Sequence, residues 1–307
     1  SVTHTWKATP GSSAWNTAAN WVEGSVPTTT SVVKIPASAT QPVLSGNTTI
    51  SYLHLDFGAG INIGANTLTL SNTLVNYNSP IVSNGGTIQG SAIGVFVNSN
   101  VQGNITLIFD TGIMQGNNVF QNNLTLTINP TLGTSFQLAA YNPDTYYGTV
   151  TITNNGSGGL NLAGYADSTD PPTTFEQAFT YINNANSLNY FAEGTTAGSL
   201  LFKGNVTLTD NATGSGSFIR IWKAELQQSA TLYTKASEIH FGGTVLLKGT
   251  LHLNAEGGTY RFGTTNVVLS HPATIQVGGL GFSSGTVLLG GLQYQSTTPL
   301  TLLLGDG

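Results

Sequence analysis

Charged residues are scarce in this 307-residue sequence, and cysteine is absent altogether. Lysine and arginine number 8, aspartate and glutamate 13, and together they make up 7% of the chain. Without cysteine there can be no disulfide framework and no thiolate metal site. The net charge of −5 disfavours nucleic acid as a partner, because phosphate binding depends on clustered positive charge. No apolar run is long enough to cross a bilayer, so we expect no membrane span.

Glycine and proline are frequent, with 38 and 11 copies, and both disfavour helix interiors. Hydrophobic residues still make up 39% of the chain, which is enough for a continuous core. Solubility must then come from uncharged polar side chains, above all Asn, Thr, Ser and Gln. Thr suits strands and Asn suits turns, because Asn tolerates left-handed backbone geometry. This composition predicts short strands joined by polar corners.

Short apolar runs recur from residue 48 onward, and most of them alternate a hydrophobic residue with Thr or Asn. Examples are residues 66–70, 104–109, 123–128 and 149–153. Such alternation indicates strands that bury one face. Gly or Asn-Gly breaks separate the runs, and two-residue hairpin loops are rare, which disfavours antiparallel sheets. We therefore predict an all-β fold, a right-handed parallel β-helix (solenoid), with a jelly roll or β-sandwich as the alternative.

A weak internal repeat accompanies these strands. Residues 146–152, 202–208 and 241–247 share the pattern aromatic-x-Gly-(Thr/Asn)-Val-x-(Ile/Leu), at offsets of 56 and 39 residues. Irregular spacing around a constant strand is typical of a parallel β-helix, whose loops vary in length. The alignment predicts that Val150, Val206 and Val245 point inward at equivalent positions of the coil.

The N-terminal region, residues 1–47, differs from the rest and is predicted to cap the solenoid. It holds Trp6, Trp15 and Trp21, whose rings are expected to cover the open end of the core. Stacking of these rings on carbohydrate is the alternative.

The remainder, residues 48–307, is predicted to be the β-helix itself. Two stretches, 165–197 and 223–237, break the strand pattern and are expected to leave the rod as loops or helical turns, where function often lies. The strand pattern runs to the last residues, so we expect the β-helix to continue beyond residue 307.

The sequence offers few groups for catalysis, and we expect no enzyme activity and no cofactor. Its acidic residues are spread thinly, whereas glycoside hydrolysis needs two neighbouring carboxylates. Asp167 and Asp170, with Glu176 nearby, form the one local group, and a calcium site there is left open. His240 and His252 would lie close together if the chain turned between them, but zinc needs a third ligand.

Two stretches resemble a known family. One comprises residues 15–21, 24–28 and 33–36, and the other residues 239–247 and 273–287. Together they resemble the very long, repeat-rich surface proteins of Bacteroidetes, which the type IX system exports and which include gliding-motility adhesins. The resemblance implies an extracellular, cell-surface location, a β-helical fibre and an adhesive role. It also implies the secretion and anchoring machinery of the outer membrane as partners.

The same resemblance gives meaning to one short motif. Asp167-Ser168-Thr169 matches the pattern at which Bacteroidetes O-glycosylate exported proteins. We therefore mark Ser168 as a possible O-glycosylation site, in a loop that is predicted to protrude.

These observations favour a non-catalytic adhesin or structural fibre that contacts an extracellular surface or a polysaccharide. One alternative is a polysaccharide lyase or hydrolase, which would need a surface cluster of at least two carboxylates. Another is ice binding by a flat threonine array, since Thr-x-Thr pairs begin at Thr67, Thr125, Thr149 and Thr207. The unequal repeat offsets argue against a regular threonine ladder.

Overall fold

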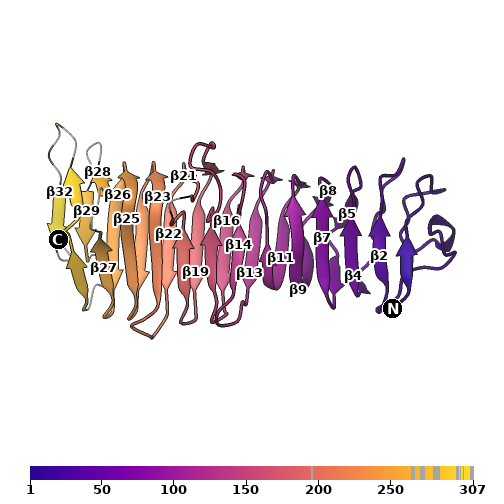
Figure 1. The fold of residues 1–307 in the computed structure, drawn as a ribbon, viewed down its shortest axis with the longest axis horizontal. Helices are drawn as coiled ribbons and strands as arrows, with labels where there is room; N and C mark the ends of the chain where they lie inside the picture. The colour runs from indigo at the N-terminus through magenta and orange to yellow at the C-terminus, as the bar shows by residue number, and fades with distance from the viewer. Residues whose placement is uncertain are drawn as a thin grey trace.

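The computed structural model describes residues 1–194, 196–263, 267–269, 274–278, 284–294, 297, 299 and 301–304. In it the chain forms an all-β solenoid of about ten coils, and strands of successive coils lie side by side along one long axis (Figure 1). Strands of successive coils pair in parallel throughout the rod. This confirms the predicted parallel β-helix and excludes the jelly roll and β-sandwich, which are built from antiparallel strands.

Each coil passes through three sheets, which we call the first, second and third sheet in their order along the coil. Two long strands, β9 (Gly86–Val97) and β11 (Ile105–Ile113), run from the first sheet into the second. Two more, β23 (Phe218–Leu226) and β25 (Glu238–Leu247), run from the second into the third. These four strands join the three sheets into one continuous hydrogen-bonded network.

The other strands belong to one sheet each. The first sheet contains β3 (Thr48–Ile50), β6 (Thr67–Leu70), β13 (Leu124–Ile128), β16 (Val150–Asn154), β19 (Phe179–Asn183), β22 (Val206–Asp210), β24 (Ala230–Thr234), β26 (Thr250–Ala255), β29 (Thr274–Val277) and β32 (Thr301–Leu304). The second contains β1 (Thr3–Thr5), β2 (Val32–Ile35), β4 (Tyr52–Leu55), β7 (Thr73–Tyr77), β14 (Ser135–Leu138), β17 (Gly159–Leu162), β20 (Leu188–Phe191), β27 (Thr259–Phe262) and β30 (Thr286–Leu288). The third contains β5 (Ile61–Gly64), β8 (Pro80–Ser83), β10 (Asn100–Gln102), β12 (Val119–Phe120), β15 (Thr145–Tyr146), β18 (Thr173–Phe175), β21 (Leu200–Phe202), β28 (Val267–Leu269) and β31 (Leu292–Tyr294).

Coil length varies along the rod while the strand register is kept. In the first sheet, Ile105 pairs with Leu124, Leu124 with Val150, and Val150 with Phe179, so these coils take 19, 26 and 29 residues. The added residues lie in the corners, because a residue inserted within a strand would move every later side chain to the opposite face. The sheets therefore stay continuous over coils of unequal length.

Alternating sequence explains the strands and their buried face. On the first sheet, one inward position per coil forms an aliphatic column in which a tyrosine takes one place. Its members are Leu68, Ile88, Leu107, Leu126, Ile152, Tyr181, Leu208, Leu232 and Leu253, all at most 1% exposed. Burial of apolar surface stabilises the fold by about 25 cal/mol per Å². Each level supports the next, as expected for a solenoid.

A column of aromatic rings runs up the inside of the third sheet. The rings of Phe120, Tyr146, Phe175 and Phe202 stack in sequence, with centroids 5.2, 4.8 and 4.9 Å apart and interplanar angles of 18°, 3° and 9°. Stacked pairs of this kind contribute roughly 0.5–1.5 kcal/mol each beyond their buried area.

Buried amide side chains form a ladder where the first sheet ends. Asn154 Nδ2 donates to Asn183 Oδ1 at 3.2 Å, and Asn183 Nδ2 donates to Asp210 Oδ1 at 3.0 Å. The three residues are fully buried and pair with one another in the strand register. The ladder satisfies polar groups that would otherwise be costly inside the core.

The structure contradicts one predicted excursion and divides the other. Residues 223–237 do not leave the rod, because they contain the end of β23 and all of β24, both in register with neighbouring coils. The range 165–197 contains β18, β19 and β20 as regular levels. Between these strands, the connections 163–172 and 192–199 join the second sheet to the third. These stretches do not look like strands in the sequence because polar and charged residues occupy the outward positions of their strands.

The repeat alignment is also partly wrong. Val150, Val206 and Val245 are buried, with 1%, 3% and 0% exposure. Val150 and Val206 share one column of the first sheet through Phe179, which lies between them. Val245 instead pairs with Ala224 in the third sheet, and the residue in the column of Val206 is Leu251. The matching copy is residues 247–253, six residues after the one chosen.

The N-terminal region joins the solenoid earlier than residue 47. Within it, β1 pairs in parallel with β2, and β2 pairs with β4 of the next coil. Trp6 and Trp15 pack edge to face on Trp21, at centroid distances of 5.0 and 4.8 Å. All three rings are at most 1% exposed and belong to the hydrophobic core. Their faces are not available to stack on carbohydrate, which removes that alternative.

Candidate binding surfaces

Two tyrosines stand exposed at the corner between the second and third sheets. Tyr141 follows β14 and Tyr165 follows β17 in the next coil. Their rings stack with centroids 5.7 Å apart and an interplanar angle of 24°. Tyr141 is 47% exposed and Tyr165 54% exposed, in contrast with the buried aromatic column of the third sheet. The pair therefore presents aromatic surface, with two polar hydroxyl groups, to solvent.

The tyrosine pair lines a cleft of about 490 Å³, which we call the tyrosine cleft. Its lining consists of Tyr141, Asn142, Tyr165, Asp167, Ser168, Asp170 and Thr196. The first two come from one coil, the next four from the connection 163–172 and the last from the connection 192–199. Coils of 26 to 29 residues therefore supply this open cleft, and its volume lies in the range typical of ligand sites.

Hydrogen bonds within the connection 163–172 shape its acidic part. Asp167 Oδ1 accepts from the backbone N and the Oγ1 of Thr169, both at 2.9 Å, and the backbone N of Asp170 donates to the carbonyl of Asp167. The bonds from Thr169 hold the pKa of the Asp167 carboxyl below its usual value. Asp167 is therefore ionised at neutral pH, and its Oδ2 is left facing solvent.

The sequence-predicted acidic group is divided by the structure. Asp167, Ser168 and Asp170 lie together in the cleft, and Ser168 is exposed there. Glu176 instead directly follows β18 of the third sheet, and its Oε1 is 2.9 Å from Lys203 Nζ. Among the described residues, no group of three or more His, Asp or Glu side chains is arranged to hold a metal ion.

His240 and His252 do not come together as the zinc alternative required. His240 lies on β25 in the second sheet, beside Glu238 and against the ring of Trp222. Burial lowers the pKa of His240. His252 projects from β26 in the first sheet, in register with Thr231. The chain between them crosses the third sheet, which places them on different faces.

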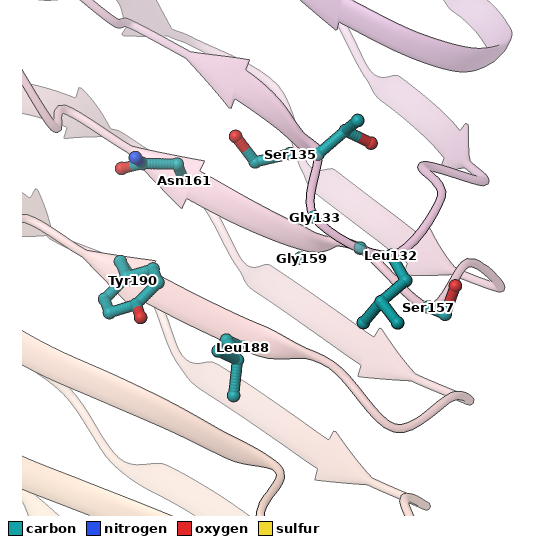
Figure 2. A pocket seen from close by; sticks show the side chains of 10 residues that line it. Leu132, Gly133, Ser135, Ser157, Gly159, Asn161, Leu188 and Tyr190 are labelled. Atoms are coloured by element: carbon teal, nitrogen blue, oxygen red, sulfur yellow. The ribbon is translucent and has the colours of Figure 1, made fainter.

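A smaller hollow of about 250 Å³ lies over the second sheet (Figure 2). Gly159 has no side chain at a position where the neighbouring strands carry Ser135 and Leu188, and Leu132 borders the same hollow. Leu132 and Leu188 are 82% and 45% exposed. The lining carries no charged residue, so it offers apolar contact area without a charge to orient a ligand.

The outward side of the first sheet carries a row of threonines, one per coil, over eight successive levels. Its members are Thr67, Thr87, Thr106, Thr125, Thr151, Thr180, Thr207 and Thr231. A second row lies two residues further along each strand and contains Thr49, Thr69, Gln89, Ile108, Thr127, Thr153, Ile182, Thr209 and Tyr233. We call these two rows the threonine face.

The threonine face corrects two expectations. The pair predicted at Thr149 and Thr151 is in fact Thr151 and Thr153, because the backbone N of Thr149 donates to Asn123 Oδ1 at the corner before the strand. Unequal repeat offsets were also expected to prevent a regular threonine ladder. The rows nevertheless continue from coil to coil, because the added residues lie in corners. Neither row of the threonine face contains a charged residue, although the exposed Asp110 follows Ile108 by two positions on β11.

Sequence reasoning missed Tyr141 and Tyr165. The two residues are 24 positions apart and no motif links them. Only the length of the coil between them shows that Tyr165 lies over Tyr141. The repeat alignment instead joined levels two coils apart and passed over the coil between them, which contains Phe175 and Phe179.

Comparisons with protein-family models, with curated proteins and with solved structures found no match to this chain. In the described part of the chain, no helix has both the length and the apolar character needed to cross a membrane.

Proposed function

We propose that this chain is a non-catalytic segment of a bacterial surface adhesin and that it holds polysaccharide in the tyrosine cleft. The proposal rests on one observation: two exposed, stacked tyrosines share a cavity with free carboxylate and amide groups. In this proposal the rod is exported by the type IX system to the cell surface. Ser168 remains a proposed O-glycosylation site at the edge of the cleft.

The chemistry of a sugar ring supports this choice of ligand. A pyranose has apolar C–H faces and a rim of hydroxyl groups, so it suits a site with aromatic surface and nearby hydrogen-bond acceptors. The cleft offers the rings of Tyr141 and Tyr165 beside Asn142, whose amide both donates and accepts, and Asp170. An extended rod also presents its ligand site away from whatever anchors it.

The state of the carboxylates supports binding in preference to hydrolysis. A glycosidase needs one carboxylic acid whose pKa is raised so that it can protonate the leaving group. In the tyrosine cleft, Asp167 is held ionised by its bonds to Thr169, which lower its pKa. The lyase or hydrolase alternative would have to use Asp167 as a base or nucleophile with Asp170 as the acid.

A binding assay with matched tyrosine variants tests the proposal. We expect Tyr141→Ala and Tyr165→Ala to weaken retention on immobilised polysaccharides by about tenfold, or ~1.4 kcal/mol, because each removes half of the aromatic surface. Tyr147→Ala is the control, since Tyr147 is 49% exposed but does not line the cleft. Equal retention of all three variants would contradict the proposal, as would release of sugar fragments by the unmodified protein.

The threonine face favours a second candidate function, binding to ice. Its hydroxyl and methyl groups repeat with the spacing of the strands, about 4.8 Å, over eight levels. Its lack of charge disfavours an ionic mineral, and Tyr233 is the single aromatic residue in its two rows, which disfavours a sugar platform. A regular, neutral, hydrogen-bonding lattice such as ice fits those properties.

Ice-growth measurements separate this candidate from the first. We expect the unmodified protein to hold crystals below their melting point without growth, and Thr151→Lys to abolish this by placing a long charged side chain in the middle of the face. Thr174→Lys is the control, because Thr174 projects from the third sheet. Normal ice growth with the unmodified protein, or equal activity of both variants, would exclude ice binding.

A further inference from the structure

The tyrosine cleft carries negative charge that the protein does not neutralise. Among the described residues, the ion pairs involve neither Asp167 nor Asp170. Both bonds that the Asp167 carboxylate accepts end on Oδ1, which leaves Oδ2 available, and Asp170 is half-buried in the same lining. Two carboxylates with free oxygens therefore face one cavity.

Few basic residues lie near these carboxylates. The sequence contains no lysine or arginine between Lys34 and Lys203, a stretch that includes both tyrosines and both carboxylates. Lys223 reaches the neighbouring connection from the coil beyond, but its Nζ donates to the carbonyls of Gly194 and Ala197, each at 2.9 Å. These bonds leave the charge of Lys223 in place, but Lys223 does not line the cleft, and Asp167 and Asp170 are the charged residues of its described lining.

Aromatic faces beside carboxylates form a site for a cation. The quadrupole of a tyrosine ring attracts positive charge over its face, and a carboxylate forms short, charge-assisted hydrogen bonds with an ammonium group. Calcium is a poorer fit, because it takes six to eight oxygen ligands and has no use for aromatic faces. A cationic organic group can contact both the aromatic rings and the carboxylates.

We propose that the tyrosine cleft selects polysaccharide carrying protonated amino groups, of the glucosamine type, over neutral polysaccharide. This inference rests on the proposed function, since it specifies the sugar class that the same site takes. Tyr141 and Tyr165 provide the surface for the sugar ring, and Asp167 and Asp170 receive the ammonium group. The selectivity comes from the carboxylates and the general affinity from the rings.

A pair of oligomers that differ in charge tests the proposal. The probes are the hexamer of glucosamine and the hexamer of N-acetylglucosamine, which share a backbone, while acetylation removes the positive charge of each amine. Titration calorimetry at about pH 5.5 and low salt should show the glucosamine hexamer binding roughly tenfold more tightly. The difference should shrink at about 1 M NaCl, because salt screens exposed charges.

Matched variants assign the preference to the cleft. Asp167→Asn and Asp170→Asn keep the shape of the side chains, and together they should bring the two affinities to within about twofold of each other. Asp110→Asn, at an exposed carboxylate on β11 outside the cleft, should leave the preference unchanged. Tyr165→Ala should weaken both hexamers.

The outcomes distinguish this inference from the proposed function. Equal binding of the two hexamers, with loss of both in Tyr165→Ala, would overturn the amine preference and leave polysaccharide binding in place. A preference that survives both Asp→Asn changes would also overturn it. If neither hexamer binds, or if Tyr165→Ala changes nothing, the assignment of the cleft to these sugars fails together with the preference.

Discussion

Asp144 is fully buried, and its carboxyl group accepts two hydrogen bonds from neighbouring residues. Asn118 N donates to its Oδ1 at 2.8 Å, and Tyr146 Oη donates to its Oδ2 at 2.8 Å. Burial nevertheless dominates and raises the pKa of Asp144 to about 7, because the charged form loses its hydration. Burial also raises the pKa of Asp210, in the amide ladder of the first sheet.

This environment predicts a stability that falls as pH rises. The unfolded chain loses the Asp144 proton near its ordinary pKa of 3.8, whereas the folded chain keeps it to about pH 7. Between those values the folded state binds more protons, so unfolding becomes easier with increasing pH, by a few kcal/mol at most. Thermal melts from about pH 4 to pH 8 should show this decline.

Asp144→Asn should make the decline shallower, because asparagine imitates the protonated acid. Some slope should remain from Asp210, whose pKa moves in the same direction. Asp110→Asn serves as the control at an exposed carboxylate. A melting temperature that rises between pH 4 and pH 7 in the unmodified protein would contradict the assignment.

A substitution at Val206 tests which face of the first-sheet strands is buried. It is 3% exposed and sits between Phe179 and Ala230, so Val206→Asp would place a carboxylate without a partner in the core. We expect a loss of several kcal/mol or failure to fold, measured by urea denaturation. Thr207→Asp, one residue later and facing outward, should cost far less. Similar losses for both would mean that the strand faces are assigned wrongly.

At the scale of the element, close packing at the corners between strands explains why the repeat contains a glycine. Gly148, Gly204 and Gly249 each follow a third-sheet strand by two residues. A Cβ on any of them would lie 2.3 to 2.4 Å from backbone atoms of the preceding coil. The glycine of the repeat therefore marks a corner where two coils touch backbone to backbone. Its presence at residue 249, within 247–253, identifies the copy that the alignment missed.

Gly204→Ala should therefore destabilise the protein. The new methyl group would meet the backbone of Gln177, which cannot move without displacing a whole coil, and we expect a cost of roughly 1–3 kcal/mol. Gly216→Ala is the matched control, because nothing lies within 4 Å of the position of its Cβ. Chemical denaturation of the two variants gives the comparison. An equal effect would show that these corners have room to relax.

At the scale of the whole molecule, charge is unevenly distributed along the rod. The four lysine and arginine ion pairs found among the described residues all lie between Glu176 and Arg261. The earlier coils rely on neutral ladders, such as Asn123 N donating to Asn104 Oδ1 at 3.1 Å. The two parts of one solenoid therefore use different polar interactions between coils.

This asymmetry predicts a local response to salt. Raising NaCl from about 0.05 to about 1 M should reduce hydrogen-exchange protection between residues 176 and 261, by no more than about 1 kcal/mol per ion pair. Protection over residues 61–128 should not fall, because hydrogen bonds between neutral groups are not screened in this way. Mass spectrometry of exchange resolves the two regions. A uniform fall along the chain would contradict the prediction.

The sequence by itself determined the class of fold. Alternation in runs such as residues 66–70 and 123–128 specifies strands with one buried face, and the rarity of hairpin turns specifies parallel winding. The shortage of charge likewise follows directly from composition, and with it the neutral character of the threonine face. These are local properties, which each stretch of chain carries wherever its neighbours lie.

Only the tertiary structure decided which residues meet. Coils of 19 to 29 residues shift the partner of each side chain by up to ten positions, and the corners alone fix that shift. For this reason Leu251 and not Val245 continues the column of Val206, and Tyr165 lies over Tyr141. Contacts between coils depend on the sum of loop lengths, which no short motif encodes. The tyrosine cleft is therefore a property of the stacked coils, although every residue in it is ordinary in the sequence.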